Sequence, residues 1–442
     1  LGAHCVHDSD AFWHLMLGRA VLRARARIVP EPTALAVWSE PCHVKEWLWD
    51  VFTYGVQQLG GFWLLSMLPS VFGALLGYRL ARWVELHAGA GVRLIHTVLA
   101  SLPVCAVAEV LDVRPNLAFF PLLVWTLELS TRFARASGRE RGRLGVGLCL
   151  LTLFWVQVHS SNVLAPVVFG LSLLDARLAD ARAGELRERL RGDGLVLIGM
   201  LLALMTGAYG LQVAQLVLTH AGGDAARHIT DMRRFDWEHF TPLTWHVPAI
   251  VVLLAGMGAL GVLTSSAPVW SALALAALGG AMTFSAARFV FVWSLLLLPL
   301  AAAGVAALAR ASDARPLPRL QWLSVGLLFG CVVWSATRVD AAYGPLFHYG
   351  LREGDHPRAA ARLLKMLPAG TRVFSEYTLG APLGFELDGH ARTFVDSRTM
   401  LYFDETDFAL SRDMIVNGAA MARGIQRFGL EAAVVERDSS AC

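Results

Sequence analysis

The sequence predicts a polytopic α-helical membrane protein, with about 10 to 11 spans and a small α/β domain at its C-terminus. Of its 442 residues, 55% are hydrophobic and only 17% are charged, whereas a soluble domain carries about 25% charged residues. Apolar runs long enough to cross about 30 Å of hydrocarbon recur along the first three quarters of the chain. The last quarter alternates helical segments with short apolar strands, which indicates a small, partly parallel sheet.

The apolar runs divide the chain into a first outer segment (1–60), a transmembrane domain (61–338) and a C-terminal domain (339–442). Ten spans are expected, at 62–82, 92–111, 115–132, 144–159, 162–176, 195–218, 247–264, 268–285, 288–308 and 320–338. The fourth and fifth are short, and they could instead be a broken pair that meets at HSSN, residues 159–162. Breaks at membrane depth are tolerated only where they line a protein-covered or watery cavity.

Arginines predict the orientation of the spans. Of the 38 basic residues, 36 are arginine, and most of those in connections fall in 79–93, 132–143, 177–194 and 310–319. By the positive-inside rule these loops face the cytoplasm. Residues 1–60, 219–246 and everything after about 339 therefore face outward. No basic arm with interleaved aromatic residues is present, so nucleic-acid binding is set aside.

Smaller elements are expected in the two outer parts. The first outer segment contains two amphipathic helices, at 13–27 and 46–59, which suit the interfacial zone of a membrane. The tail contains helices at 356–367 and near 413–428, and strands at 371–376, 391–398 and 431–436. Because the chain begins with Leu1 and has no basic or apolar leader, we expect a signal peptide or a first span to lie upstream.

Two acids, Asp8 and Asp10, stand just ahead of Phe12, Trp13 and His14 in the segment DSDAFWHL. Acids at this spacing can converge on a divalent cation such as Mg²⁺ or Mn²⁺, or one can act as a general base. Alternatively, Asp10 caps the helix expected from Phe12, which is worth about 1 kcal/mol. The two roles are compatible. Asp10 is the stronger candidate because the helix start fixes its carboxylate, whereas Asp8 is expected to be more mobile.

Further polar residues are expected at the outer ends of spans. His159 is an ionisable residue at membrane depth, which indicates either a functional group or a neutral histidine that bridges two helices. Arg114 and Arg288 lie at outer boundaries, where they could bind a lipid phosphate or snorkel to the surface. Glu46 heads the second outer helix, where a carboxylate also favours the helix N-terminus.

Other chemistry has little support in the sequence. There is no P-loop, CxxC or HExxH motif, and no GxSxG motif in a suitable context. Cys5 and Cys42 both fall in the first outer segment, where the compartment permits oxidation. They form either a disulfide or two unpaired thiols, since the sequence cannot supply their separation.

The segment DSDAFWHLMLGR resembles the D-x-D-x-x-W-H-L-x-x-G-R opening of bacterial GT-C superfamily membrane glycosyltransferases, which are related to oligosaccharyltransferase and protein mannosyltransferase catalytic subunits. Further segments resemble this family in the same order: HVKEWLWDVFTYGVQQLGG, VRPN, WVQVHSS, ARFVFVW, and FSEYTLGAPLGF with FVDSR. The chain departs from the family pattern at Gln157, Ser160 and Ser397, which replace Asn, Gly and Gly. The segment RFDWEHF has Asp236 where the family has glutamate.

The resemblance implies a GT-C-like enzyme of the bacterial inner (plasma) membrane. Its donor would be a polyprenyl-phosphate-linked sugar, and the acceptor, which is not identified, would lie on the outer face. Asp8 or Asp10 would activate the acceptor or hold a divalent cation, with His14 and Glu46 as further catalytic candidates. The substrate-binding candidates are His159, Arg114, Arg288, Trp13, Asp236 and Arg398. Membrane lipid and membrane protein partners are also expected.

The alternative is a GT-C-like scaffold that has lost catalysis and serves as a subunit of a membrane assembly. The retained Asp8 and Asp10 favour the enzyme, whereas the altered Gln157, Ser160 and Ser397 favour the scaffold. A solute transporter is a more distant alternative, because the conspicuous polar residues cluster on the outer side rather than at the midplane of the membrane.

Overall fold

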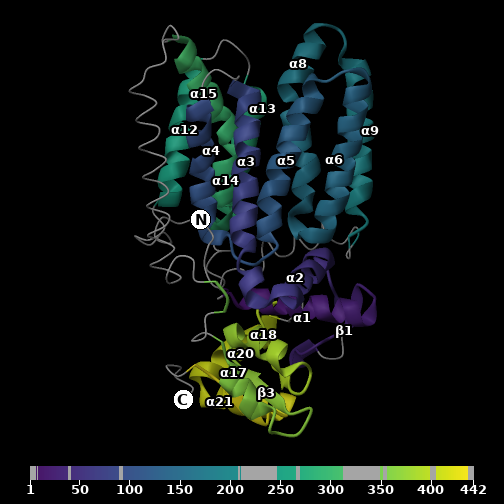
Figure 1. Cartoon of the computed structure of the whole chain (residues 1–442), viewed down its shortest axis with the longest axis vertical. Helices are drawn as coiled ribbons and strands as arrows, with labels where there is room; N and C mark the ends of the chain where they lie inside the picture. The colour runs from purple at the N-terminus through teal and green to yellow at the C-terminus, as the bar shows by residue number, and fades with distance from the viewer. Residues whose placement is uncertain are drawn as a thin grey trace.

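The computed structural model describes residues 6, 8–37, 41–88, 93–207, 210, 246–264, 269–311, 349–351, 356–398 and 405–436. The protein has three layers along its long axis: a bundle of long helices, the first outer segment beneath it, and an α/β domain at the far end (Figure 1). The predicted fold class, a multi-pass helical membrane protein with a small C-terminal α/β domain, is therefore confirmed.

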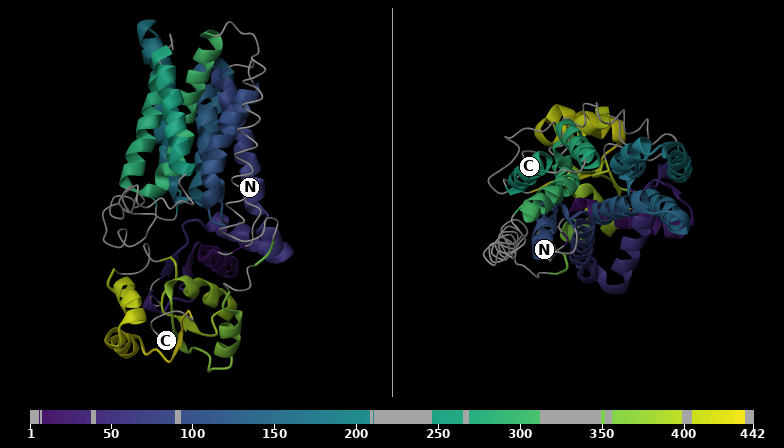
Figure 2. Two further views of the ribbon diagram at one scale, coloured as in Figure 1. Left: turned by 90° about the vertical axis from the view of Figure 1, so that its left-hand side faces the viewer. Right: turned by 90° about the horizontal axis from the view of Figure 1, so that it is seen from above.

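The first nine predicted spans all have helical counterparts, which run side by side in the bundle (Figure 2). The bundle helices are α3 (Leu68–Ala88), α4 (Arg93–Val107), α5 (Asn116–Arg135), α6 (Gly138–Val158), α7 (Leu164–Ser172), α8 (Leu174–Arg182), α9 (Leu186–Leu204), α12 (His246–Thr264), α13 (Trp270–Ser285), α14 (Val290–Leu296) and α15 (Leu298–Ala311). Within the described ranges, five helical segments are long and apolar enough to cross a membrane, or six if one bent pair counts as a span. The tenth predicted span, 320–338, lies outside the described residues.

The fourth and fifth predicted spans form a helical hairpin. α6 ends at Val158, and His159 is extended, with φ −153° and ψ 140°. The 3-10 helix η4 (Ser160–Val163) then begins the return into α7 and α8. Of the two sequence-based interpretations, the structure therefore supports two separate spans. The segment HSSN is the tight turn between them, at the end of the bundle that faces the first outer segment.

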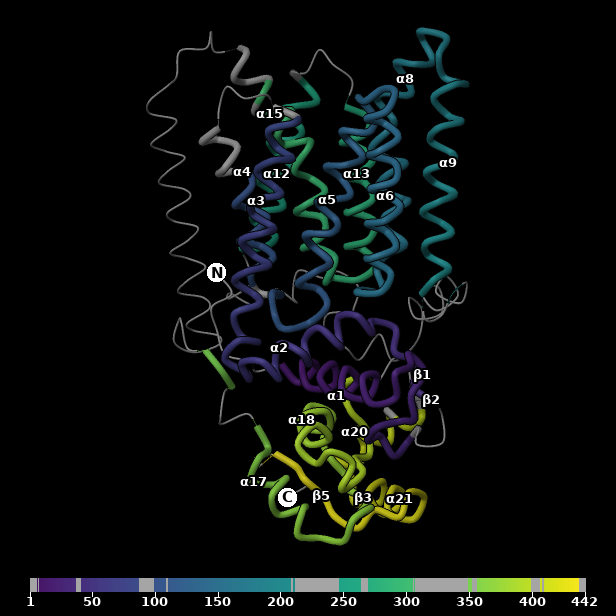
Figure 3. Tube along the Cα trace, turned by 45° about the vertical axis from the view of Figure 1, so that its right-hand side comes forward, coloured from purple at the N-terminus to yellow at the C-terminus, as the bar shows by residue number. Residues whose placement is uncertain are grey.

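The first outer segment lies across that end of the bundle (Figure 3). It contains α1 (Ser9–Ala24), the antiparallel strands β1 (Ile28–Pro30) and β2 (Pro41–His43), and α2 (Trp47–Leu65). α1 begins at Ser9 because the Asp8 carboxylate accepts the Asp10 backbone N–H at 3.0 Å. The expectation that Asp10 caps this helix is therefore wrong. α2 meets α3 at an angle of 86°, so the first bundle helix begins at Leu68 rather than at residue 62.

α1 is enclosed between the bundle and the C-terminal domain, so it is buried on more than one face. Phe12 and Met16 pack against Ala381 of the C-terminal domain, while Leu15 belongs to the main core. On the side of α2, a Cβ added at Gly18 would lie 2.1 Å from the backbone carbonyl oxygen of Asp50. Only glycine allows the two helices this close approach.

The basic face of α1 contacts the C-terminal domain. Arg19 and Arg23 both form ion pairs with Asp388, at 3.1 and 2.9 Å. The arginines that made this helix look interfacial in the sequence therefore have a protein partner.

The C-terminal domain is a three-stranded parallel sheet with the strand order β4-β3-β5, covered by helices. Its elements are α17 (Arg358–Leu364), β3 (Arg372–Ser375), α18 (Tyr377–Leu387), β4 (Arg392–Thr393), α20 (Glu405–Val416), α21 (Gly418–Phe428) and β5 (Ala432–Val434). All three predicted strands are present, although shorter. The predicted helix near 413–428 is two helices, because Asn417 starts a new one by accepting the Ala419 N–H at 2.9 Å.

α18 has no counterpart among the predicted elements. Its sequence, YTLGAPLGFEL, holds two glycines and a proline, which disfavour a helix in isolation. Packing overrides this preference. A Cβ at Gly380 would lie 2.0 Å from the carbonyl oxygen of Val395, and one at Gly384 would lie 2.9 Å from the Met16 sulfur. These glycines let α18 lie flat between its own sheet and α1.

The orientation of the bundle gives a testable prediction. Arg139, at the start of α6, and Ala422, in α21, are both exposed and lie at opposite ends of the molecule (Figure 1). Because the arginine-rich loops are predicted to be cytoplasmic, a membrane-impermeant maleimide added to intact cells should label Ala422→Cys. Arg139→Cys should react only after permeabilisation. The reverse pattern would overturn the predicted topology.

Candidate functional site

The predicted polar residues gather where the first outer segment meets the end of the bundle. Asp8 and Asp10 open α1, and Glu46 precedes α2. Arg114 lies in the turn before α5, His159 ends α6, and Arg288 lies in the 3-10 helix η7 (Ala287–Phe289). Asp236 lies outside the described residues. We call the six described residues the outer polar cluster: Asp8, Asp10, Glu46, Arg114, His159 and Arg288.

Arg114 joins both acids of the first outer segment. Its Nε contacts Asp8 Oδ2, its Nη2 donates to Asp8 Oδ1 at 2.7 Å, and its Nη1 lies 3.1 Å from Asp10 Oδ2. A planar guanidinium binds a carboxylate through two parallel hydrogen bonds in this way. Asp8 is therefore the more firmly held acid, contrary to the expectation that it is mobile. Asp10 is the more accessible, with 22% of its side chain exposed.

Asp10 is the acid whose environment suits proton transfer. Burial raises its pKa to about 6, and the charge of Arg114 offsets part of this increase. Two carboxylates share one guanidinium here, so the Asp8 charge also raises the Asp10 pKa. The Ser397 hydroxyl and the Trp13 indole lie near the Asp10 carboxyl and lower its pKa. Neither group makes a hydrogen bond of normal geometry with the described residues. A carboxyl group with this pKa can exchange a proton near neutral pH.

His14 forms a buried pair with Asp50. His14 Nδ1 lies 2.5 Å from Asp50 Oδ1, and both residues are almost completely buried. Burial lowers the pKa of His14 and raises that of Asp50, so it disfavours the charged form of both groups. The Trp13 ring lies over the His14 ring, with 3.5 Å between the centroids. Sequence reasoning missed Asp50, although it lies four residues after Glu46 in the same helix face.

His159 is neutral and fixed in one tautomer. The Ser161 backbone N–H donates to His159 Nδ1 at 3.0 Å, so Nε2 carries the proton and donates to Asn116 Oδ1 at 2.9 Å. Burial lowers the pKa of His159 to about 4. The next residue in the turn, Ser160, donates its backbone N–H to Glu46 Oε1 at 3.1 Å. Glu46 and Asn116 therefore hold the hairpin turn from two sides.

Two cations face this turn. Arg288 and Lys45 both lower the pKa of His159. Burial lowers the pKa of Lys45, and the charge of Arg288 lowers it further. Lys45 makes no ion pair with the described residues, so its ammonium group can serve a bound anion. Sequence analysis overlooked Lys45. It is one of only two lysines among 38 basic residues, and that departure from the arginine bias was the available signal.

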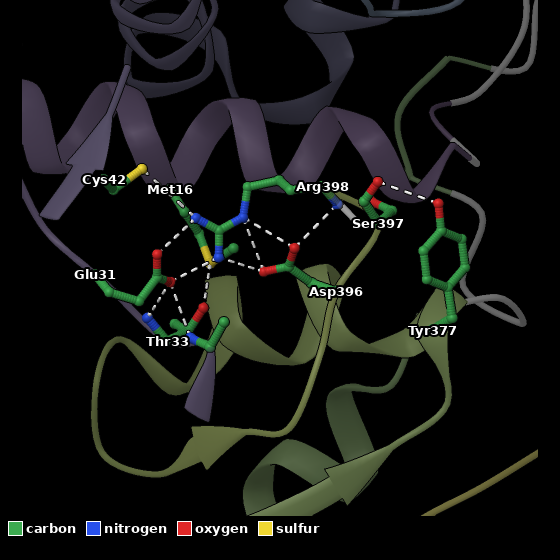
Figure 4. A network of polar contacts seen from close by, with 9 residues as sticks. Met16, Glu31, Thr33, Cys42, Tyr377, Asp396, Ser397 and Arg398 are labelled. Carbon is green, nitrogen blue, oxygen red and sulfur yellow. Dashed lines mark hydrogen bonds and ion pairs between the residues drawn. The ribbon is translucent and has the colours of Figure 1, made fainter. Parts of the chain in front are cut away.

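Arg398 lies outside this cluster, in the contact between the first outer segment and the C-terminal domain (Figure 4). Its guanidinium donates to Glu31 Oε1 at 2.6 Å and to Asp396 Oδ2 at 2.5 Å. All three side chains are at most 1% exposed. The adjacent Ser397 is the residue that faces Asp10. The motif FVDSR thus anchors the domain through Arg398 and contributes to the outer polar cluster through Ser397.

The arrangement of Asp8 and Asp10 does not fit a divalent cation. Three of their four carboxylate oxygens contact the guanidinium of Arg114, and such cations need several free oxygen ligands. The described ranges hold no group of three histidine, cysteine, aspartate or glutamate residues that could bind a metal. The predicted pairing of Cys5 with Cys42 stays a prediction, because Cys5 lies outside the described residues. Cys42 is buried, and its sulfur lies 3.8 Å from Arg398 Nη1.

No protein-family model and no curated protein sequence matches the chain. Its fold is similar to solved structures of the Archaeoglobus fulgidus oligosaccharyltransferase. The AglB complex with an inhibitory peptide and a dolichol-phosphate has a TM-score of 0.65 at 10% identity, over 98% of this chain and 66% of that one. The complex with Zn and sulfate has a TM-score of 0.59 at 10% identity, over 98% of this chain and 64% of that one. The form tethered to an acceptor peptide with the NVT sequon has a TM-score of 0.58 at 9% identity, over 96% of this chain and 65% of that one.

These similarities establish the fold. The chain shares the fold of those structures and spans slightly less than two thirds of their length.

The anchor of the C-terminal domain gives a second prediction. Removing one partner of a buried ion pair costs about 3–5 kcal/mol, whereas an exposed pair is worth about 0.2–1 kcal/mol. Arg398→Met should therefore lower the thermal stability of the purified protein and expose the domain to limited proteolysis. Arg23→Met, which removes an exposed pair across the same contact, should leave both nearly unchanged. Equal effects of the two variants would contradict the anchoring role of Arg398.

Proposed function

We propose that the protein is a glycosyltransferase that moves a sugar from a polyprenyl-phosphate-linked donor to an acceptor outside the bacterial inner membrane. The observation that carries this proposal is the outer polar cluster, which combines a carboxyl group of raised pKa with cations at the boundary of a helical bundle. The GT-C-like fold, shared with a structure that contains a dolichol-phosphate, supports a lipid-linked donor.

Asp10 is the proposed general base. The acceptor hydroxyl or amide would attack the anomeric carbon of the sugar while its proton passes to the Asp10 carboxylate. The bond between the anomeric carbon and the phosphate oxygen breaks, and its electron pair leaves with the polyprenyl phosphate. A single displacement of this kind inverts the anomeric centre. Because the phosphate is already a good leaving group, a base and cationic stabilisation are the main requirements.

Lys45 and Arg288 are the proposed partners of the donor phosphate. Both lower the pKa of His159, which precedes the hairpin turn. Lys45 makes no ion pair with the described residues, and a lysine binds phosphate as a point charge. His159 and Glu46 would act by holding this turn, because their polar atoms are engaged with Asn116 and Ser160. Trp13 lies against His14 next to Asp10, where it could contact the sugar or the acceptor.

The second candidate function is a scaffold subunit of a membrane assembly without catalysis. The observation that favours it is the structural use of Gln157, one of the residues that departs from the family pattern. Gln157 accepts the Trp47 indole N–H at 2.7 Å and donates to Thr206 at 3.0 Å. An inactive wild-type protein that purifies with stable partner subunits would decide for this alternative.

The proposed base gives a third prediction. Asp10→Asn is nearly isosteric, so it should leave the fold intact and lower turnover of a polyprenyl-phosphate-linked sugar by about 10²–10⁴-fold. Release of polyprenyl phosphate is a suitable measurement, because it does not require the acceptor to be identified. Asp413→Asn is the matched control, since Asp413 is a half-exposed acid of the C-terminal domain. Equal activity of wild type and Asp10→Asn would remove Asp10 from the mechanism.

The raised pKa of Asp10 gives a fourth prediction. Only the ionised carboxylate can accept a proton, and the Asp10 pKa lies at about 6. Turnover should therefore rise with pH through about 6 and level off above it. The protein should stay folded whether Asp10 is protonated or ionised. The measurement is the pH dependence of polyprenyl-phosphate release under saturating donor. A flat profile between pH 5 and 7 would contradict this assignment of the base.

A further inference from the structure

We infer that Arg114 supplies, as part of the chain, the positive charge that the two acids of the first outer segment would otherwise take from a divalent cation. Arg114 is thereby a positioning residue that acts through Asp10. The inference rests on the proposed function for its catalytic meaning, but its structural content can be tested without any sugar transfer.

The geometry is that of a cation site already filled. Asp8 presents both oxygens to the guanidinium, and its Oδ1 also accepts the Asp10 N–H at 3.0 Å. Asp10 presents Oδ2 to the third nitrogen, Nη1, at 3.1 Å. All three guanidinium nitrogens therefore face the acid pair. Only Asp10 Oδ1 is left without a guanidinium contact, and a single carboxylate oxygen does not hold Mg²⁺ or Mn²⁺ in competition with water.

Charge leads to the same conclusion. Two ionised acids and one guanidinium leave a net charge of about −1, which Asp10 protonation can remove. A divalent cation in the same place would lie within a few ångströms of a guanidinium that cannot lose its proton in proteins, and like charges at that distance repel each other. Cation binding therefore requires Arg114 to leave.

The backbone that carries Arg114 is held in place. The Arg114 N–H donates to the carbonyl oxygen of Asp112 at 2.6 Å, and the Arg114 carbonyl oxygen accepts the Leu117 N–H at 3.0 Å. Pro115 follows as the N-cap of α5, and its ring fixes the backbone at that position. The next residue, Asn116, is held by His159. The guanidinium therefore comes from a hydrogen-bonded turn of the bundle and meets Asp8, 106 positions earlier in the chain.

The first test is cation binding by the full-length protein in detergent, with Mn²⁺ as the probe and the signal of free Mn²⁺ in electron paramagnetic resonance as the measurement. We expect no saturable binding of Mn²⁺ below about 1 mM to the wild type. Saturable binding that Asp8→Asn removes would overturn the inference. This test needs no turnover, so its outcome is independent of whether the proposed function holds.

The second test separates positioning from a structural role. Because Arg114 lowers the pKa of Asp10, Arg114→Gln should move the acid limb of the pH profile to higher pH. Arg114→Lys keeps the charge and should leave the limb near its wild-type position, with turnover reduced by the loss of the bidentate contact. Arg25→Gln, at an exposed arginine at the end of α1, is the control and should match the wild type.

The outcomes of the second test are distinct. A limb that moves in Arg114→Gln but not in Arg114→Lys supports the inference, and so does wild-type turnover that survives a chelator such as EDTA. Turnover lost with EDTA and restored by Mn²⁺ would overturn it. A uniform loss of activity in Arg114→Gln, with an unchanged limb and an unchanged melting temperature, would also overturn it. If Arg114→Gln does not fold, Arg114→Lys and the chelator experiment still decide.

Discussion

The ion pair between Arg114 and the two aspartates at the start of α1 is the contact on which the outer polar cluster depends. Arg114 belongs to the bundle and the aspartates to the first outer segment, so the pair sets how these two layers meet. The same turn places Asn116 against His159. One short segment, Arg114-Pro115-Asn116, therefore positions the acids on one side and the hairpin turn of α6 on the other.

The C-terminal domain is attached by contacts of unequal value. The exposed pair of Arg23 with Asp388 is screened by water, so it aligns the surfaces without adding much stability. Arg398, Glu31 and Asp396 are buried away from water. Loss of any one of them would leave an uncompensated charge in the interior. An edge contact adds to this, because the Ala36 N–H donates to the carbonyl oxygen of Phe394 at 3.2 Å. The position of Ser397 beside Asp10 follows from this attachment.

Much of the fold could be predicted from the sequence because membrane spans and short strands leave strong patterns. The length of the apolar runs located the bundle helices, and a short apolar run between two helical segments located the strand at 371–376. α18 could not be predicted, because its glycines and proline become favourable only where the sheet and α1 approach it. At the site, residue type identified Asp10 and His159. Asp50 and Asn116, the partners of His14 and His159, could not be identified, because a pairing across distant segments depends on how the layers meet.

The burial of Glu31 under a residue 367 positions later has a consequence for biosynthesis. Glu31 and the Arg398 that covers it are made far apart in time. At about 5–20 residues per second, roughly 20 to 70 s pass between them. The bundle that covers one side of α1 is itself made during that interval, while Phe12 and Met16, which later pack on Ala381, still lack that partner. The nascent chain thus exposes an apolar strip until its last quarter has folded, so the final assembly step is docking of a late domain onto an early helix.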